Sequence, residues 1–555
     1  MGCLVVNDAR FVKGRSMAPG LLPSIGLLAA LGLVACDGRI SGGRSATEPP
    51  DVGPEAREVS LGPAVGRRLT REEYFNSLEV VLGVDLDADD YDLPRDNRAP
   101  EGFRNSAQDL LLSPARVRAY DAISNDAIAQ ADVTGFVSRY ATCTEMRADC
   151  YDGFVDSIGL LLLRRTVSDA DRVFFSRLFT VAQEEGEGFQ AGVALVMRAM
   201  LQSPYFLYRL ESQAGNNPGE GREIDSFELA TRLSFLVWNA APDQGLLDLA
   251  QQGNLRENID AQVKRLLEDP RTRRAFRQYI EQWLYLDAVP PSFDLGTDMK
   301  EETYRLFERL VWGEDADFMQ AFTEERAELS GALASFYGLE PLESGFTTYD
   351  LSGVPERIGF LTNASVLAAR TINPRSSMID RGLFVLNDLF CESVAPPDAP
   401  ELRDAIDEIA VPETSGLSQR ERFAIQSEEA VCRGCHGLFD PLGLALEQYG
   451  AAGQHITEDE FGNPLTGGGS VAVGDVNVDY GDIEEFAAAL RASETVSRCA
   501  VEKSVQHAFG RRMGPRDTDL LSDTHASFAA NGSTYRGLIH AIATHPEFLL
   551  VEVAP

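Results

Sequence analysis

The amino-acid sequence predicts a mainly α-helical protein, with a multi-helical N-terminal lobe followed by a helical C-terminal lobe that carries a small β-hairpin. Apolar residues recur at helical spacing in one segment after another, as in residues 227–238 and 483–509. Helix-start signals precede several of these segments, and no strand-rich region of comparable length interrupts them. The chain has 555 residues, of which 44% are hydrophobic and 25% are charged. We therefore expect a large folded protein rather than a disordered chain.

Three helix starts can be placed on capping residues. Thr70 precedes a helical pattern and Glu73 follows three residues later, which is the capping-box arrangement. Ser168 and Asp171 repeat this arrangement before another helical pattern. The pair Ser113-Pro114 puts a proline in a first turn, where its missing N–H would have no intrahelical partner. We expect helices to begin at these three positions.

The N-terminus resembles a bacterial lipoprotein signal. Residues 1–16 carry a net positive charge, and the apolar run from Leu21 to Val34 is too short to cross a bilayer comfortably. The run ends in Ala35-Cys36, where the cysteine would be acylated. An ordinary secretory signal and a short anchor helix are the alternatives. We expect residues 1–36 to be a lipoprotein signal peptide with its lipobox, Cys36 to be lipidated, and residues 37–66 to be a flexible tether.

These features predict a location in a bacterial cell envelope, with the lipid as the only membrane anchor and the protein facing the periplasm or the exterior. Disulfides are permitted in such an oxidising location. Cys143 and Cys150 bracket a polar hexapeptide between helical patterns, so we expect them to form a local disulfide loop. Cys391 and Cys499 are left over, and the simplest assignment pairs them with each other.

The two other cysteines belong to the run Cys432-Arg433-Gly434-Cys435-His436. In c-type haem attachment the two thiols of a CxxCH motif bind the vinyl groups of the haem, and the histidine becomes the proximal iron ligand. Zinc would need four ligands, and no second Cys/His pair stands at finger spacing. A thioredoxin-like motif would need a βαβ surround, which is absent. We expect one covalent haem c at Cys432, Cys435 and His436; another metal or redox role and a vestigial or structural motif are the alternatives.

The surroundings of this motif are typical of a cytochrome c-like domain. Residues 418–431 form a short helical pattern that would deliver the motif at its C-terminal end, and residues 483–509 form a second amphipathic segment. Between them, the alternation in VAVGDVNVDY (471–480) indicates a small hairpin. The run Asp440-Pro441-Leu442-Gly443 has two interpretations: a turn that stops the motif helix, or a group in which Pro441 orients the imidazole.

The sixth ligand of the iron has three candidates. Met513 is the only methionine downstream of the motif and lies just past the second amphipathic segment, so we rank it first. His507 comes next, and Met378 is third. A methionine ligand would raise the reduction potential relative to a second histidine.

The chain between the tether and the C-terminus divides into consecutive blocks. We expect helical blocks at 67–140, 141–215 and 222–350, a helical connector at 353–400, and the haem domain with terminal helices at 415–555. Two arginine pairs, Arg67-Arg68 and Arg164-Arg165, stand near helix starts. Contact with haem propionates or with a partner is one interpretation of these pairs, and salt-bridged surface is the favoured one.

Several segments match one set of exported proteins in the same order. They are RLTREEY (68–74), RRTVS (164–168), SPYFLYRLE (203–211), ELATRLSFLVW (228–238), GFLTNASVL (359–367), DRGLFVL (380–386), CRGCHGLFDPLGLALEQYG (432–450) and the Cys499 segment ending in FGRR. On these residues the chain resembles the planctomycete-type cytochrome-c-associated proteins, built from consecutive domains of unknown function. The resemblance spans about residues 67–555 and implies a secreted or envelope haem-associated protein, often encoded near an exported partner, but no reaction. Leu444 stands where the family usually has an aromatic residue, and Tyr449-Gly450 where an Asp is expected nearby.

Charge and motifs then limit the function. With 86 acidic and 50 basic side chains the net charge is −36, which disfavours binding to nucleic acid. No nucleophile elbow, P-loop, dinucleotide fingerprint or HExxH zinc motif occurs. We expect an envelope lipoprotein that carries one c-type haem and exchanges electrons with a redox partner protein in the envelope. A haem-dependent oxidoreductase whose helical lobe before residue 350 binds a substrate, and a non-enzymatic scaffold or binding lipoprotein with a structural CxxCH, are the alternatives.

Overall fold

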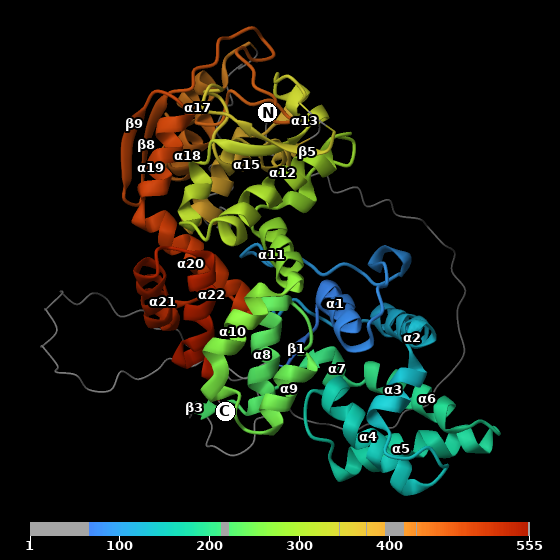
Figure 1. Ribbon diagram of the computed structural model, residues 1–555. Coiled ribbons are helices and arrows are strands. Elements are labelled where there is room, and N and C mark those ends of the chain that lie inside the picture. Colours follow the sequence, from blue (N-terminus) through green and yellow to red (C-terminus); the bar gives the residue numbers. More distant parts are fainter. Residues whose placement is uncertain are drawn as a thin grey trace, which may run out of the picture. The chain divides into compact units, whose positions relative to one another are not determined.

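A computed structural model of the chain describes residues 66–211, 221–342, 344–372, 375–394, 416–428 and 430–552 (Figure 1). These residues form helix after helix, and their strands make only two-stranded sheets, so the predicted mainly α class is confirmed. Within the described part of the chain, every helix is too short or too polar to span a bilayer. Cys36, the predicted signal peptide and the predicted tether up to residue 65 lie outside the described residues.

The first helical segment covers residues 66–211. Its helices are α1 (Arg71–Leu82), η1 (Ala88–Asp90), α2 (Pro114–Gln130), α3 (Val133–Tyr140), α4 (Ala148–Leu163), α5 (Asp169–Glu184), α6 (Phe189–Leu201) and α7 (Pro204–Leu207). All three predicted helix starts are confirmed. Thr70 and Ser168 each form a capping box, and Ser113 caps α2 with Pro114 in its first turn. The apolar faces of these helices enclose one core that includes Tyr74, Phe154 and Phe179.

The second segment runs from residue 221 to residue 394. Its helices are α8 (Ser226–Trp238), α9 (Gln244–Gln251), η2 (Arg256–Asn258), α10 (Ile259–Glu268), α11 (Pro270–Trp283), η3 (Leu286–Ala288), α12 (Gly296–Glu308), η4 (Arg309–Gly313), η5 (Phe318–Phe322), α13 (Gly331–Phe336), η6 (Phe360–Thr362), α14 (Ala364–Ala368), α15 (Met378–Phe384) and η7 (Val385–Leu389). Two of the short elements, η4 and η7, are π-helical turns. Trp238, Trp283 and Phe307 are buried in a second core, which residues of the C-terminal helices share.

The third segment covers residues 416–552. Its helices are α17 (Gln419–Gln426), α18 (Ala430–Leu444), α19 (Ile483–Ala492), α20 (Glu494–Phe509), η8 (Pro515–Asp517), α21 (Thr518–Ala530), α22 (Tyr535–Thr544) and η9 (Pro546–Leu549). The segment 483–509, predicted as one amphipathic stretch, is thus two helices. Ser493 separates them, and its hydroxyl accepts the N–H of Val496 at 3.1 Å as the cap of α20.

Five antiparallel strand pairs join parts of the described chain. They are β1 (Arg67–Arg68) with β2 (Tyr208–Arg209), β3 (Gly221–Glu223) with β10 (Leu550–Glu552), β4 (Arg326–Ser330) with β5 (Phe346–Asp350), β6 (Thr371–Ile372) with β7 (Arg375–Ser376), and β8 (Gly469–Val473) with β9 (Val476–Tyr480). The predicted hairpin is β8–β9, and Figure 1 shows it beside α18 and α19. The pairs β1–β2 and β3–β10 connect segments that are far apart in sequence.

Three of the four arginines in the two sequence pairs are buried, which corrects the prediction that they form salt-bridged surface. Arg67 and Arg68 each lie 2.5 Å from a buried carboxylate oxygen, of Glu73 and Asp96 respectively. Arg164 has no carboxylate at ion-pair distance among the described residues. It donates instead to three main-chain carbonyls in α7 and β2. Burial is possible because each guanidinium has acceptors inside the fold.

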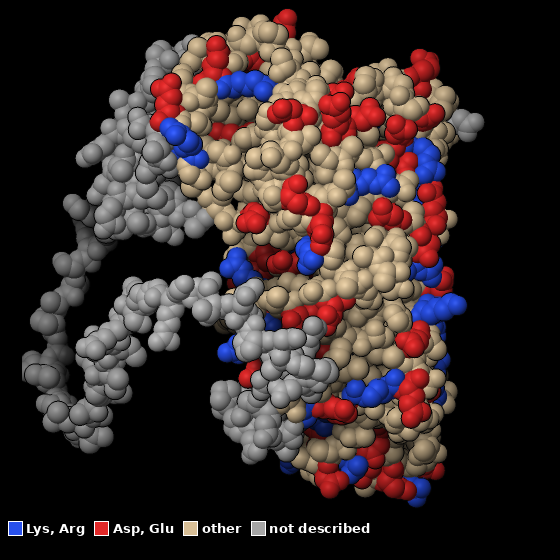
Figure 2. Space-filling model, turned by 90° about the vertical axis from the view of Figure 1, so that its left-hand side faces the viewer, with Lys and Arg blue, Asp and Glu red and all other residues tan. Residues whose placement is uncertain are grey.

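Charge on the surface is mixed rather than segregated. On the face drawn in Figure 2, acidic and basic side chains interleave over the described residues. The excess of negative charge is therefore spread over this face and does not form one patch.

Candidate functional site

The CxxCH motif lies in the first half of α18. Because an α-helix turns once in 3.6 residues, Cys432, Cys435 and His436 at i, i+3 and i+4 share one helix face. All three residues are half-buried, and neither thiol is bonded to another cysteine. The described structure therefore brings the three predicted haem-binding residues together on one face.

The motif begins a helix of its own, whereas the sequence predicted that it would close the helical pattern at 418–431. Helix α17 ends before the motif, and the side chain of Arg433 hydrogen-bonds to the main chain between α17 and α18. The guanidinium Nε of Arg433 donates to the carbonyl of Ser427 at 2.7 Å, and its Nη2 donates to the carbonyl of Glu428 at 2.8 Å. The last carbonyls of a helix lack intrahelical partners, so a side chain from inside the motif completes the end of the preceding helix.

The imidazole of His436 is oriented by Asp440, one turn further along α18. Its Nδ1 lies 3.0 Å from Oδ2 and 3.1 Å from Oδ1 of Asp440. Asp440 is buried, and this burial raises the pKa of its carboxyl while the hydrogen bond with His436 opposes the rise. A carboxylate at one ring nitrogen fixes the orientation of a metal-binding histidine and leaves the other nitrogen for the metal. In this geometry the nitrogen left for an iron is Nε2.

Asp440 and Pro441 lie inside the motif helix, which corrects the turn interpretation of residues 440–443. Helix α18 continues to Leu444 with Pro441 in its interior. Pro441 has no N–H with which to bond the carbonyl four residues earlier. The residue that orients His436 is Asp440 and not Pro441, and the sequence analysis missed this role. The i, i+4 spacing of His436 and Asp440 was the available signal.

The motif helix packs against α15 at backbone contact. A Cβ atom on Gly443 would lie 2.0 Å from the carbonyl oxygen of Met378, and one on Gly382 would lie 2.1 Å from the carbonyl oxygen of Phe439. Only glycine fits at these two crossings. Arg381 is buried beside Gly382 and donates to three main-chain carbonyls at and beyond residue 446, and burial lowers its pKa to about 9. Helix α15 thus fixes the position of the motif helix and the loop that follows it.

Both predicted disulfides are confirmed. Cys143 and Cys150 are bonded, as are Cys391 and Cys499. The sulfur atoms of Cys143 and Cys150 lie close to a carboxylate oxygen of Asp149 in an arrangement that resembles a metal site. Because the disulfide consumes both thiols, this cluster offers no thiolate ligands.

The longer disulfide lies beside a buried ion pair. The Nζ atom of Lys503 is 2.8 Å from Oδ1 of Asp388, three residues before Cys391. Burial raises the pKa of the Asp388 carboxyl, and Lys503 opposes the rise. The covalent bond and the ion pair together tie α20 to η7, which also contacts the motif helix.

Met513 and Met378, the two methionines predicted as possible sixth ligands, lie in different parts of the fold. Met513 is buried in the second core, in the loop after α20. Met378 is the first residue of α15, and its backbone contacts Gly443 of α18. Gly443 itself lies about 10 Å from His436 along the axis of α18, at 1.5 Å per residue. In the described residues, the ring contacts of His436 are with Phe423 and Phe439. The choice of a sixth ligand stays a prediction.

His507 occupies an aromatic environment in α20. Its ring meets those of Phe103 and Tyr279 edge-on, with 5.2 Å between ring centroids in both cases. Burial lowers the pKa of His507 to about 4, so the imidazole is neutral at physiological pH. Its role as an iron ligand also stays a prediction.

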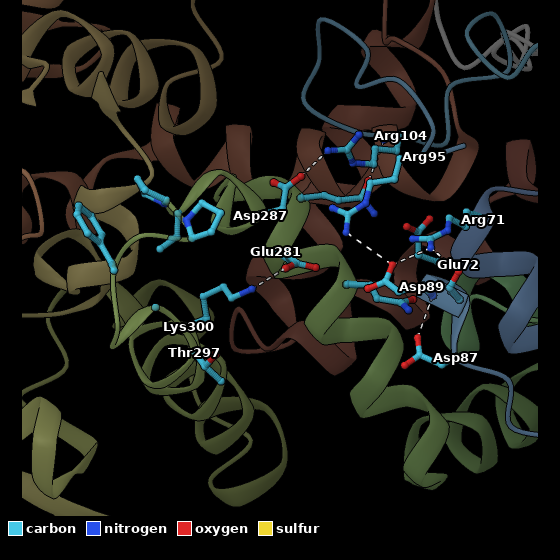
Figure 3. Close-up of a pocket in the computed structure, with 18 of the residues that line it drawn as sticks. Arg71, Glu72, Asp87, Asp89, Arg95, Arg104, Glu281, Asp287, Thr297 and Lys300 are labelled. Carbon is cyan, nitrogen blue, oxygen red and sulfur yellow. Dashed lines mark hydrogen bonds and ion pairs between the residues drawn. The ribbon is translucent and has the colours of Figure 1, made fainter. Parts of the chain in front are cut away.

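A second candidate site is a cavity of about 630 Å³ in the helical lobe (Figure 3). Most charges on its walls are already paired. The ion pairs are Arg71–Asp89, Arg95–Asp89, Arg104–Asp287 and Lys300–Glu281. Glu72 differs, because its buried Oε2 has no hydrogen-bond partner in the described structure and burial raises the pKa of its carboxyl. Arg71 and Glu72 lie in a matched block, RLTREEY (68–74), but the sequence analysis gave no wall residue a role in a site. The pattern of charged residues does not distinguish a cavity wall from open surface.

The chemistry of the residues on α18 fits a c-type haem. Thioether attachment needs two reduced thiols next to a histidine on one helix face, and this is the arrangement of Cys432, Cys435 and His436. Asp440 adds the carboxylate partner that metal-binding histidines commonly have.

Comparison with protein-family models gives five matches in chain order. All are described as "Protein of unknown function": DUF1587 over residues 67–133, DUF1595 over 150–211, DUF1592 over 224–339, DUF1588 over 357–459 and DUF1585 over 478–548. The motif helix and α15 both lie in the match at 357–459. No curated protein and no solved structure matches the chain.

Proposed function

Because the chain belongs to the planctomycete cytochrome-c-associated family of proteins with consecutive domains of unknown function, we propose that it carries one covalent haem c and transfers electrons outside the cytoplasm. Cys432 and Cys435 would hold the haem, and His436 would be the proximal ligand of its iron. The electron donor or acceptor would be a protein partner in the envelope.

The observation that carries this proposal is the state of the cysteines. Of the six cysteines in the described residues, four form disulfides, and the two with free thiols are those of the motif. Both free thiols lie on the helix face of His436. A purely structural motif would be served by a bond between Cys432 and Cys435, and this pair is not bonded.

The bound haem would supply a one-electron couple at its iron. The chain's own residues would set the conditions for it. Asp440 holds Nδ1 of His436 and keeps Nε2 available, and its negative charge makes the imidazole a stronger electron donor. The half-buried thiols and imidazole leave this face of α18 accessible to a partner protein.

We also propose export and lipid anchoring at Cys36. The two disulfides support an oxidising compartment. Mass spectrometry of the mature protein should find an acylated Cys36 as the first residue. A mature chain that begins elsewhere, or that retains Met1, would reject the anchor.

The test of haem attachment uses the full-length protein, exported in a host with c-type haem attachment machinery. We expect a haem stain that survives denaturing electrophoresis and a pyridine haemochrome spectrum at one haem per chain. The double variant Cys432→Ser, Cys435→Ser should lose the stain. Cys143→Ser with Cys150→Ser also removes two cysteines and should keep it. A wild-type protein without haem, in which Cys432 and Cys435 are bonded to each other, would reject the proposal and favour the scaffold alternative.

A second candidate function is a haem-dependent oxidoreductase, and the cavity of about 630 Å³ is the observation that favours it. This volume is within the range of small-molecule sites, and one carboxyl oxygen of Glu72, Oε2, has no hydrogen-bond partner in the described structure. Small polar compounds can be screened for reduction of the haem. A compound that acts through the cavity should lose its effect in Glu72→Gln and keep it in Glu484→Gln, which changes an exposed carboxylate on α19. Equal reduction of the haem in both variants would show that the compound does not act through the cavity.

A further inference from the structure

Four arginines from four separate segments line one small cavity of about 70 Å³. Arg67 lies in β1, Arg209 in β2, Arg232 in α8 and Arg511 just after α20. Arg67 directly precedes one of the blocks on which the family resemblance depends, and the other three arginines lie within such blocks. The four arginines also fall in four different family matches. The haem motif contributes nothing to this cavity.

Three of these arginines have a carboxylate partner of their own. The ion pairs are Arg67–Glu73 at 2.5 Å, Arg232–Glu211 at 2.6 Å and Arg511–Asp517 at 2.7 Å. Arg232 also donates to the carbonyls of Phe548 and Leu550, which hold it in place. The charge of each of these guanidinium groups is therefore balanced within the fold.

Arg209 has no such partner. Across the described residues its guanidinium makes neither a hydrogen bond nor an ion pair, and its one recorded contact is with the ring of Phe235, 5.1 Å from the guanidinium carbon to the ring centroid. Burial and the neighbouring Arg67 lower the pKa of Arg209 to about 9. Glu73 and Glu211 act on Arg209 electrostatically, but each forms its ion pair with another arginine, Arg67 and Arg232 respectively. Arg209 is half-buried, so its five N–H donors, which have no acceptor among the described residues, are open to a ligand or to water in the cavity.

The same cavity is also lined by Glu547 and two aromatic rings. Glu547 is 3% exposed, and its Oε2 has no hydrogen-bond partner in the described structure. Burial, together with Asp517, raises the pKa of Glu547 to about 7, so near neutral pH its carboxyl is partly protonated and able to donate a hydrogen bond. Phe509 and Phe548 pack edge to face, with 6.0 Å between centroids, and make the apolar part of the wall.

We propose that this cavity binds one small oxyanion, a carboxylate or a tetrahedral anion such as phosphate, against the guanidinium of Arg209. The anion would supply the acceptor and the negative charge that Arg209 lacks. The volume admits one small anion or a few water molecules and excludes anything larger. Because the site joins four segments of the chain, the bound anion would also hold them together and stabilise the fold.

The test uses the full-length exported protein in phosphate-free buffer. Thermal unfolding and calorimetry are measured with inorganic phosphate, sulfate and acetate, against chloride at equal ionic strength. We expect at least one oxyanion to bind saturably and to raise the unfolding temperature, and chloride to have no such effect. The difference between phosphate and acetate identifies which oxyanion geometry the site prefers.

Three variants then test whether the oxyanion binds at Arg209. Arg209→Gln should weaken oxyanion binding about tenfold or more, because a charged hydrogen bond is lost. Arg498→Gln makes the same change of charge at an exposed position of α20 and should leave binding unchanged. Glu547→Gln keeps a donor without the negative form of the carboxyl, so it should bind at least as tightly as the wild type.

A wild-type protein that responds to oxyanions no more than to chloride would overturn the proposal, whether or not Arg209→Gln folds. Equal binding by Arg209→Gln and Arg498→Gln would also overturn it. These outcomes do not depend on haem attachment, so they can be told apart from a failure of the proposed electron-transfer function.

Discussion

The Nδ1 atom of His436 lies 3.0 Å from Oδ2 of Asp440, so the candidate iron ligand and the group that orients it occupy one turn of the same helix. Both the ligand and its partner therefore move with α18. The position of α18 depends in turn on α15, through the contacts at Gly382 and Gly443.

The first prediction concerns Asp440. In the haem-loaded protein, Asp440→Asn should keep the haem and shift the midpoint potential to a more positive value. The shift should be on the order of 60 mV, a tenfold change in a one-electron equilibrium, because a neutral amide makes the imidazole a weaker donor to the iron. Spectroelectrochemical titration measures the shift. Glu428→Gln removes an exposed carboxylate near the start of the motif helix and should leave the potential almost unchanged. An equal shift in both variants would indicate a general charge effect and would contradict the role given to Asp440.

The second prediction concerns the contact between α15 and α18. Gly443→Ala should lower the free energy of unfolding by about 3 kcal/mol or more, because the added Cβ meets a main-chain carbonyl oxygen that cannot move independently of its helix. Gly437→Ala lies on the same helix, where a Cβ would approach only the Arg433 side chain, at 4.0 Å. It should be neutral or stabilise the protein by up to about 1 kcal/mol. Denaturant unfolding of both variants measures the difference, and similar values would show that the helices are not in backbone contact.

The third prediction compares the two disulfides. Cys391 and Cys499 are 108 residues apart, whereas Cys143 and Cys150 are 7 apart. In the chain-entropy model a longer closed loop stabilises more, about 4–5 kcal/mol for the first bond against about 2–3 kcal/mol for the second. Replacing each pair by serine and measuring denaturant midpoints should therefore show the larger loss for Cys391 and Cys499. A larger loss for the short loop would mean that native contacts, rather than loop closure, set the effect of these bonds.

The fourth prediction concerns Glu302, a carboxyl that is 2% exposed in α12 and accepts the hydroxyl of Tyr337 at 2.7 Å. Burial raises its pKa to about 7, so the folded state binds its proton more tightly than the unfolded state does. The resulting stabilisation is fully present below the unfolded-state pKa of about 4.5 and is lost as the pH rises through about 7. It amounts to about 3 kcal/mol.

Glu302→Gln imitates the protonated form and removes this titration. The wild type should therefore become less stable relative to Glu302→Gln between pH 4.5 and pH 8, by up to about 3 kcal/mol in denaturant unfolding. Glu187→Gln, at an exposed loop position, should follow the wild type at every pH. A constant difference between the wild type and Glu302→Gln would mean that Glu302 keeps one protonation state throughout.

Features encoded within a few residues were predicted correctly. The caps at Thr70, Ser113 and Ser168 and the hairpin at 471–480 depend on short-range spacing and turn chemistry, and they are present as expected. The family resemblance depends on the order of short blocks, and the five family matches confirm it. The disulfide partners followed from the number of cysteines and their assumed location.

The errors in the sequence analysis share one cause. Arg67, Arg68 and Arg164 were expected at the surface because a charged side chain is usually exposed, but here carboxylates or carbonyls from other segments surround them. One of the two interpretations of residues 440–443 was a turn that ends the helix at Pro441, yet α18 continues past Pro441 while α15 packs against the helix. In both cases the deciding neighbour comes from a distant part of the chain.

The sequence by itself determined the helical class, the capping positions, the cysteine pairs and the CxxCH face of one helix, because each follows from local spacing or from residue counts. Only the tertiary structure decided that glycines let α15 touch α18, and that Arg209 lies unpaired in a cavity shared by four segments. Burial and charge balance are properties of surroundings, and those surroundings exist only after distant segments have packed together.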